Sequence, residues 1–178
     1  MDTYIIKTER LGLRNWLPSD EAPFIEMGQD PEVMRYFPNT LSKEEVQLSI
    51  ENFRKHFDAF GYTYFAMDEL STGHFIGFTG LKLQTFESEY TPSVDIGWRL
   101  ARSAWGKGYA TEAAQACMDA AFNRYYLNEV YSYCPDLNED SEAIMKKIGM
   151  EFIGTFTHPK VASDSRLKNC LVYKKTKT

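Results

Sequence analysis

The chain has 178 residues, of which 43% are hydrophobic, enough for one domain with a substantial core. Its formal net charge of −5 argues against a direct nucleic-acid-binding protein, because such proteins need a basic surface to displace counterions. The N-terminus lacks the basic and apolar regions of a signal peptide, and no run of about 18 apolar residues predicts a membrane helix. We therefore expect a single-domain cytoplasmic protein, spanning residues 1–178, with no membrane partner.

The cysteines and histidines predict no metal site. The three cysteines show no paired spacing, and the three histidines complete no zinc-ligand pattern with them. We expect each cysteine to be a small buried hydrophobic residue. They are Cys117, Cys134 and Cys170.

The first forty residues predict one strand followed by two short helices. Residues 8–14 alternate in polarity as a strand does, and Ser19 or Asp20 would cap the helix that follows. Asp30 and the proline after it predict a second short helix that ends near Tyr36, since proline is favoured in a first helical turn.

The next segment predicts a longer helix and a strand hairpin. Ser42 and Glu45 form a capping box. Apolar residues follow on one face of this helix, and we favour core packing for them over the lining of a substrate cleft. They are Val46, Ile50, Phe53 and Phe57. Residues 62–67 and 75–83 predict two strands joined by a turn. The loop at 84–92 either borders a site or is a solvated charged segment.

A strand, a glycine loop and a helix follow one another between residues 94 and 123. Residues 94–100 alternate in polarity, and small residues at three- and four-residue spacing predict a helix that begins near Gly108. Gly106 and Gly108 would lie at its N-terminus, where unpaired N–H groups and the helix dipole favour a phosphate. Lys107 and Arg102 could add positive charge. A tight turn without a ligand is equally compatible, and the spacing excludes both a Walker loop and a dinucleotide fingerprint.

The C-terminal third predicts a strand at 129–134, a helix and two further strands. Asn138 is a candidate N-cap, and Gly149 would end the helix in a left-handed conformation. Residues 152–156 and 167–173 predict the last two strands, paired with each other. The fold class that follows is mixed α/β, of the α+β type, with a largely antiparallel central sheet flanked by helices.

The sequence Trp-Gly-Lys-Gly-Tyr-Ala-Thr-Glu-Ala at 105–113 resembles the acyl-CoA loop of the GNAT superfamily of N-acetyltransferases. The likeness is to the branch of ribosomal-protein-alanine and -serine N-terminal acetyltransferases, of which residues 8–16 and 30–34 are also typical. The resemblance implies acetyl-CoA as acyl donor and a protein or peptide N-terminal amine as leading acceptor. A small-molecule amine such as a polyamine, amino acid or aminoglycoside-like compound, and a non-catalytic acyl-CoA sensor, are the alternatives. A homodimer is left open.

Carried over to this chain, the resemblance gives a set of coenzyme contacts. Ser103 stands where the family has a long polar residue, so Arg102 would substitute for it. The backbone around the loop would hold the pyrophosphate, the strand before it would present backbone to the pantetheine arm, and a side chain at the last helix would contact that arm. The expected residues are Gly106, Lys107, Gly108, Tyr109, Ala110 and Thr111 for the loop, Trp98, Arg99 and Leu100 for the strand, and Asn138.

Three residues are candidates for the chemistry of direct acetyl transfer. Ser141, in an Asn-x-x-Ser motif, would be a proton source near the thioester sulfur, although Asn and Ser also cap helices. Gly97 would mark a bulge that turns a backbone N–H toward the oxyanion, or else makes room for a packed aromatic ring. Asp95, where the branch commonly has the longer Glu, would act as base through bound water, or be an exposed strand carboxylate. Glu87 and Glu89 are weaker candidates for the base.

Overall fold

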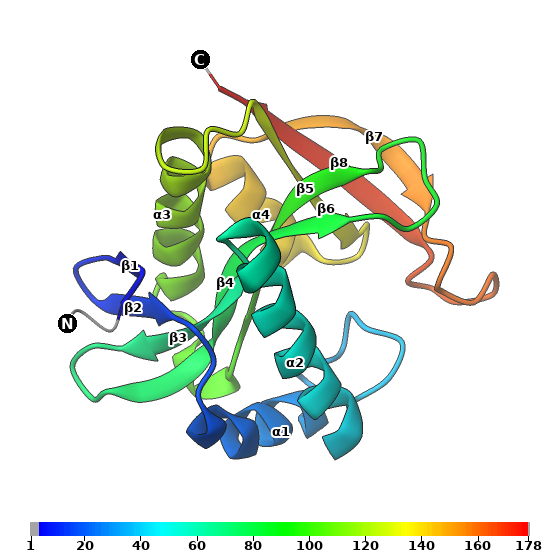
Figure 1. The fold of residues 1–178 in the computed structure, drawn as a ribbon. Coiled ribbons are helices and arrows are strands. Elements are labelled where there is room, and N and C mark those ends of the chain that lie inside the picture. The colour runs from blue at the N-terminus through cyan, green and yellow to red at the C-terminus, as the bar shows by residue number, and fades with distance from the viewer. Residues whose placement is uncertain (1–3, 178) are drawn as a thin grey trace.

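The computed structural model of the protein describes residues 4–177. Figure 1 shows the elements along the chain, beginning with a strand pair and two helices. They are β1 (Ile6–Lys7), β2 (Leu11–Arg14), α1 (Glu21–Gln29), α2 (Lys43–Phe60), β3 (Tyr64–Glu69), β4 (His74–Gln84), β5 (Ser93–Leu100), α3 (Tyr109–Asn123), β6 (Glu129–Pro135), α4 (Glu139–Lys147), β7 (Glu151–Thr157) and β8 (Asn169–Thr176). Short 3-10 turns lie at Pro18–Asp20 and Arg102–Ala104.

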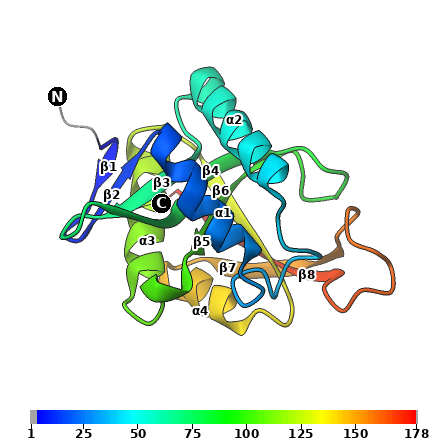
Figure 2. The same cartoon turned by 90° about the horizontal axis from the view of Figure 1, so that it is seen from below.

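The described strands form a single sheet in the order β1-β2-β3-β4-β5-β6-β8-β7. Neighbouring strands are antiparallel except β5 and β6, which are parallel. This confirms the predicted fold class and the pairing of the last two strands. Helices α1 and α2 lie on one side of the sheet, and α3 and α4 lie on the other (Figure 2).

Each side of the sheet has its own apolar core. Under α3, small residues allow close packing, and Ala113, Ala114 and Cys117 are fully buried. Under α1 and α2, Trp16 stacks on Phe24 with 5.0 Å between the ring centroids. Val46, Ile50 and Phe53 of the α2 stripe pack into this second core, as predicted, whereas Phe57 packs against the first core. All three cysteines are buried. None of the described helices is long and apolar enough to span a membrane.

The segment after α1 differs from the prediction. Residues 31–36 form consecutive turns instead of a helix. The Met34 N–H donates to the Asp30 carbonyl, but the chain turns again where the Phe37 N–H donates to the Met34 carbonyl. One helical turn is an unfavourable nucleus on its own, and burial of Val33 and Met34 fixes the turns instead. β8 likewise begins two residues later than predicted, because a turn closes from Ser165 to Lys168.

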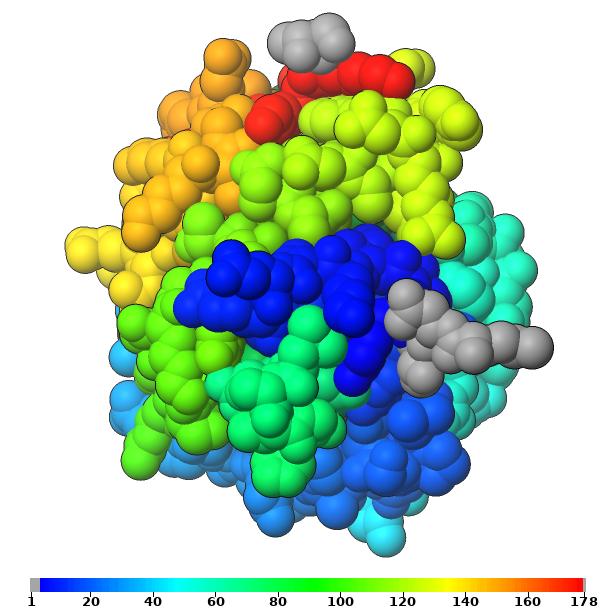
Figure 3. Space-filling view, turned by 90° about the vertical axis from the view of Figure 1, so that its left-hand side faces the viewer, coloured from blue at the N-terminus to red at the C-terminus, as the bar shows by residue number. Residues whose placement is uncertain are grey.

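The N-terminal strands anchor the start of α3. Figure 3 shows the β1–β2 segment between the β3–β4 hairpin and α3. Glu112, in the first turn of α3, accepts hydrogen bonds from the Thr8 hydroxyl at 2.5 Å and from Arg10 Nε at 2.7 Å. Arg10 Nη1 also donates to the Lys107 carbonyl at 2.9 Å. Glu112 therefore positions the glycine loop through the N-terminal segment.

Candidate active site

The candidate site opens where β5 and β6 separate. Their parallel ladder in the described chain consists of one residue pair, Asp95 with Tyr131. Next to it, the Ser132 hydroxyl donates to the Ile96 carbonyl at 2.9 Å. Beyond this point the residues of β5 from Gly97 to Leu100 line a cavity of about 970 Å³. That volume is at the upper end of the roughly 300–1,000 Å³ of small-molecule sites.

Most of the predicted site residues meet at this cavity, although they come from β5, the glycine loop, α3 and α4. Arg102 and Lys107 are not among the residues that line it. Arg102 Nε lies 4.0 Å from a carboxylate oxygen of Asp30, and Lys107 Nζ lies 3.9 Å from Glu69. The predicted residues that do line it are Asp95, Gly97, Trp98, Arg99, Leu100, Gly106, Gly108, Tyr109, Ala110, Thr111, Asn138 and Ser141.

The glycine loop has a left-handed backbone at both glycines. Gly106 has φ of +73° and Gly108, the N-cap of α3, has φ of +78°. A side chain is strained in this conformation, so glycine is favoured at both positions. The indole N–H of Trp105 donates to the Leu100 carbonyl at 2.9 Å and folds the loop back onto the end of β5. The unpaired N–H groups of the first turn of α3 thus lie at the cavity.

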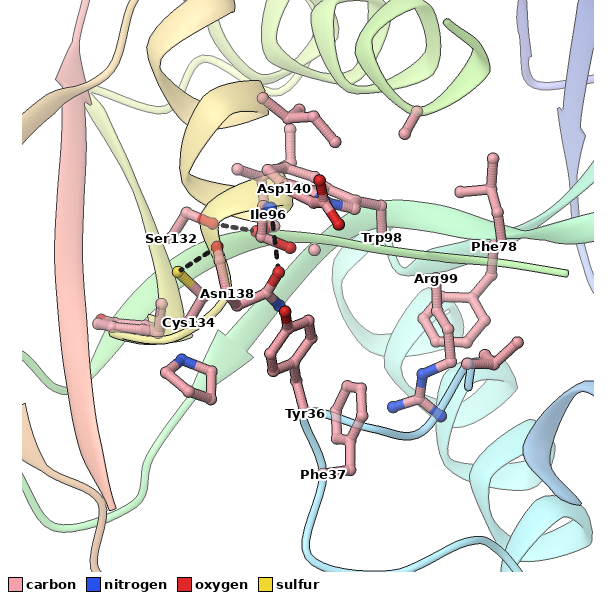
Figure 4. A pocket seen from close by; sticks show the side chains of 18 of the residues that line it. Tyr36, Phe37, Phe78, Ile96, Trp98, Arg99, Ser132, Cys134, Asn138 and Asp140 are labelled. Atoms are coloured by element: carbon pink, nitrogen blue, oxygen red, sulfur yellow. Dashed lines mark hydrogen bonds between the residues drawn. The ribbon is translucent and has the colours of Figure 1, made fainter. Parts of the chain in front are cut away.

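Asn138 and Ser141 lie at the N-terminus of α4. The side-chain oxygen of Asn138 accepts a hydrogen bond from the Ser141 backbone N–H at 3.1 Å, which confirms the predicted cap. Figure 4 shows the Asn138 side chain between the start of α4 and the ring of Tyr36. Capping and lining the cavity are therefore compatible roles for this residue.

Asp95 is buried and paired with Tyr64. The Tyr64 hydroxyl lies 2.7 and 2.8 Å from the two carboxylate oxygens and donates its proton to them, and Gln84 Nε2 donates to that hydroxyl at 3.2 Å. Burial raises the pKa of Asp95 to about 6, even though the Tyr64 hydrogen bond acts in the opposite direction. The alternative of an exposed strand carboxylate is wrong, since the residue is only 7% exposed. A carboxylate with this pKa is ionised at neutral pH and can accept a proton.

The structural reason for a glycine at position 97 differs from the predicted one. The ladder between β4 and β5 runs from Gly77–Leu100 to Gln84–Ser93 without a register shift, so the predicted bulge is wrong. A Cβ atom at Gly97 would lie 2.9 Å from the Tyr64 hydroxyl oxygen. The glycine makes room for an aromatic side chain, which was the alternative reading. It thereby lets Tyr64 reach Asp95.

Two features of the site were not predicted. Tyr64 contacts a strand that is not its neighbour in the sheet, and the sequence alone does not indicate which residue of β5 it reaches. Arg99 was expected to contribute backbone, yet its guanidinium carbon lies 3.9 Å from the centroid of the Phe37 ring beside the cavity. Glu87 and Glu89 do not line the cavity, whereas Phe86 of the same loop does.

Comparison with known proteins identifies the family. Residues 10–151 match the model of the acetyltransferase (GNAT) domain. The chain belongs to the GNAT acetyltransferases. It is 32% identical over 152 residues to the uncharacterized N-acetyltransferase YnaD of Bacillus subtilis, covering 85% of each chain. A crystal structure of a GNAT-family acetyltransferase from Bacillus anthracis superimposes with a TM-score of 0.77 at 26% identity, covering 96% of this chain and 97% of the other. The protein is thus an acyltransferase.

More distant GNAT structures share the fold with this chain. One is RimL, a ribosomal L7/L12 alpha-N-protein acetyltransferase in complex with coenzyme A, at 16% identity and a TM-score of 0.75 over 95% of each chain. Another is the spermidine N-acetyltransferase of Vibrio cholerae, at 17% identity and a TM-score of 0.74 over 95% of this chain and 96% of the other. The comparisons therefore establish the superfamily, and the ribosomal-protein branch stays a prediction.

Metal ligands do not gather in the described part of the chain. Among residues 4–177, no group of three or more His, Cys, Asp or Glu side chains is arranged to hold a metal ion. Burial raises the pKa of the Cys134 thiol, which lines the cavity, to about 12. A thiol with so high a pKa is a poor nucleophile at neutral pH.

Proposed function

We propose that this protein transfers an acetyl group directly from acetyl-CoA to a primary amine. The residues present fit the coenzyme. The left-handed Gly106 and Gly108 present backbone N–H groups at the start of α3, where a diphosphate is favoured. The edge of β5 at Trp98 faces the cavity beyond the end of the β6 ladder, where it would meet the pantetheine arm. Bound acetyl-CoA would supply the thioester.

The observation that carries the proposal is the buried Asp95 in the cavity wall. An N-terminal amine has a pKa of about 8 and an alkylamine one near 10, so at neutral pH either must lose a proton before it attacks. Asp95, with a pKa of about 6, is ionised at neutral pH and accepts that proton. Because Asp95 is buried and its carboxylate already accepts a hydrogen bond from Tyr64, we assign the transfer to a bound water that bridges the amine and this pair.

The start of α4 would serve the leaving thiolate. Ser141 follows the α4 N-cap and lines the cavity, which supports its hydroxyl as the group that would donate a proton to the sulfur. The positive end of the α4 dipole also favours negative charge there. Asn138, fixed by its hydrogen bond to the Ser141 N–H, would hold the pantetheine arm.

The leading acceptor is a protein or peptide N-terminal amine. Its support is the sequence likeness of residues 105–113 and of the Asn-x-x-Ser motif to the N-terminal acetyltransferases of ribosomal proteins. The fold is shared with RimL and with a spermidine acetyltransferase, so small-molecule amines belong in the same test.

Two measurements test the proposal. Acetyl-CoA at about 100 times its dissociation constant should stabilise the fold by roughly 2.7 kcal/mol, which a thermal shift would detect. No shift would refute the enzyme and also a non-catalytic acyl-CoA sensor. Thiol release during incubation with a panel of N-terminal peptides, amino acids and polyamines then separates the enzyme from the sensor and ranks the acceptors. Coenzyme binding without thiol release from any acceptor would favour the sensor.

A further inference from the structure

Arg99 has an unusual position in the cavity wall. Side chains alternate along a strand, so Asp95, Gly97 and Arg99 share the side of β5 that faces α1 and α2. Figure 4 shows Arg99 and Trp98 leaving the strand on opposite sides, with Arg99 pointing toward Phe37. Its guanidinium carbon lies 3.9 Å from the Phe37 ring centroid and 5.3 Å from that of Phe78.

Among residues 4–177, no carboxylate pairs with the charge of Arg99. No ion pair within residues 4–177 includes it, and its buried Nε atom has no hydrogen-bond acceptor among those residues. Arg14, which is buried as a whole residue whereas Arg99 is half-buried, shows what the fold provides elsewhere. Arg14 donates to Asp20 and Asp68 through four hydrogen bonds of 2.7–2.9 Å. Burial lowers the pKa of Arg99 to about 10, so it is still protonated at neutral pH.

The carboxylates that line the cavity are already paired. Asp140 lies 2.7 Å from Arg35, and Glu32 lies 3.7 Å from the same guanidinium. Asp95 is held by Tyr64. Leaving a buried donor unsatisfied costs free energy, and a cation among aromatic rings attracts an anion more strongly than one in water does. An anionic ligand would satisfy Arg99.

Two ligands could supply that anion, namely the coenzyme phosphates and the acceptor. The phosphate-binding N–H groups belong to the start of α3, which packs on the other side of the sheet from Arg99. Arg99 instead shares its side of β5 with Asp95, the proposed base, about 13 Å away along the strand. The side chain is thus placed for the acceptor molecule.

We propose that Arg99 binds a carboxylate of the acceptor, so that the substrate is an amine that also carries an acidic group. This inference rests on the proposed acetyl transfer and narrows its acceptor. The carboxylate can be the α-carboxylate of a free amino acid or an acidic side chain next to a peptide N-terminus. A polyamine, which brings only positive charge, is disfavoured beside the unpaired guanidinium.

Matched acceptor pairs test this inference. One arm compares an amino acid with its carboxamide, and the other compares a peptide amide bearing Glu at its second position with the same peptide bearing Gln. Both kcat/KM and calorimetric binding in the presence of coenzyme A are measured. For the wild type we expect the acid member of at least one pair to be favoured by about 10- to 100-fold, the range of a hydrogen bond to a charged group. The arm that shows the preference identifies the source of the carboxylate.

Variants of Arg99 assign the preference to its guanidinium. In Arg99→Gln the acid and amide members should become equal within about twofold, while the KM for acetyl-CoA stays unchanged. Arg99→Lys keeps the charge but lacks the planar guanidinium that can donate two parallel hydrogen bonds to a carboxylate, so it should restore part of the preference. Arg124→Gln, the same change at an exposed arginine that bonds the Ile5 carbonyl outside the cavity, is the control and should keep the full preference.

The outcomes separate this inference from the proposed function. Turnover with no acid preference in either arm would overturn the inference and leave acetyl transfer standing. An acid preference that survives in Arg99→Gln, or an acetyl-CoA affinity that falls in that variant, would also overturn it. No coenzyme binding at all would overturn both.

Discussion

Replacing Tyr64 with Phe should shift the pH dependence of catalysis toward alkaline pH. Its hydroxyl donates a hydrogen bond that stabilises the ionised form of Asp95, while burial acts against ionisation. Without the hydroxyl, burial is opposed less and the pKa of Asp95 rises further. A hydrogen bond to a charged group contributes about 1.5–3 kcal/mol. At 1.36 kcal/mol per pKa unit, the acid limb of the profile should move by about 1–2 pH units.

The assay is kcat/KM for the best acceptor, measured between pH 5 and 9 with saturating acetyl-CoA. The wild type should lose activity below a pH near 6, the pKa to which burial raises Asp95. In Tyr64→Phe the loss should begin at a higher pH, so the variant is impaired more at pH 6.5 than at pH 8.5. Tyr62→Phe is the matched control, because Tyr62 is buried nearby but does not line the cavity.

An acid limb that stays in place or moves toward lower pH would refute this reasoning. It would mean that the titrating group is not Asp95, or that Tyr64 does not hold its charged form. An equal shift in Tyr62→Phe would point to a general loosening of the fold around β3.

Three further variants test other parts of the site. Since its pKa is raised from 3.8 to about 6, Asp95 binds a proton more tightly in the folded state, and the stability of the fold falls as pH rises from about 4 to 6. Asp95→Asn should therefore gain up to about 3 kcal/mol of stability in urea unfolding at pH 7.5. Its kcat should fall about 100-fold or more, and an unchanged kcat would exclude Asp95 as the base. Ser141→Ala should lower kcat more than acetyl-CoA affinity, and unchanged kcat would leave the hydroxyl no part in proton transfer. Gly108→Ala should cost about 1–2 kcal/mol of stability and weaken acetyl-CoA binding in calorimetry; Gly73→Ala, with a similar φ of +70° in the β3–β4 hairpin, should cost stability alone.

The coenzyme side of the site could be predicted because its signals are local. A glycine loop followed by small residues at helical spacing places Gly106 and Gly108 at the start of α3, and the structure has the helix start there. Asn138 is similar, since its cap depends on a residue three positions later. In both cases the residues that decide the structure lie close together in the sequence.

The acceptor side could not be predicted, because its contacts join distant segments. Gly97 suggested a bulge, but glycine is needed at this position because the ring of Tyr64 fills the space of a side chain. Tyr64 lies on β3 and reaches Gly97 across β4. Arg99 alternates with apolar residues as an exposed strand residue would, yet turns that replace the predicted helix bring Phe37 over its guanidinium. The sequence contains these side chains but not the packing that brings them together.

The one-pair ladder between β5 and β6 divides the sheet into two unequal parts, β1 to β5 and β6 to β8. At the junction, side-chain hydrogen bonds supplement that pair, from Ser132 to the Ile96 carbonyl, between Ser93 and Tyr133, and from Tyr133 to the Tyr90 carbonyl. Apolar contacts also join the parts, because α3 packs against both and the ring of Phe86 packs on those of Tyr133 and Phe156. A small sliding movement between the two parts loses less free energy where they meet by apolar packing than where a hydrogen-bonded ladder joins them. A ligand between the strands would therefore act as a cross-link, and slower amide hydrogen exchange should extend along β8 beyond Cys170, its residue at the cavity, toward the C-terminal end of the strand.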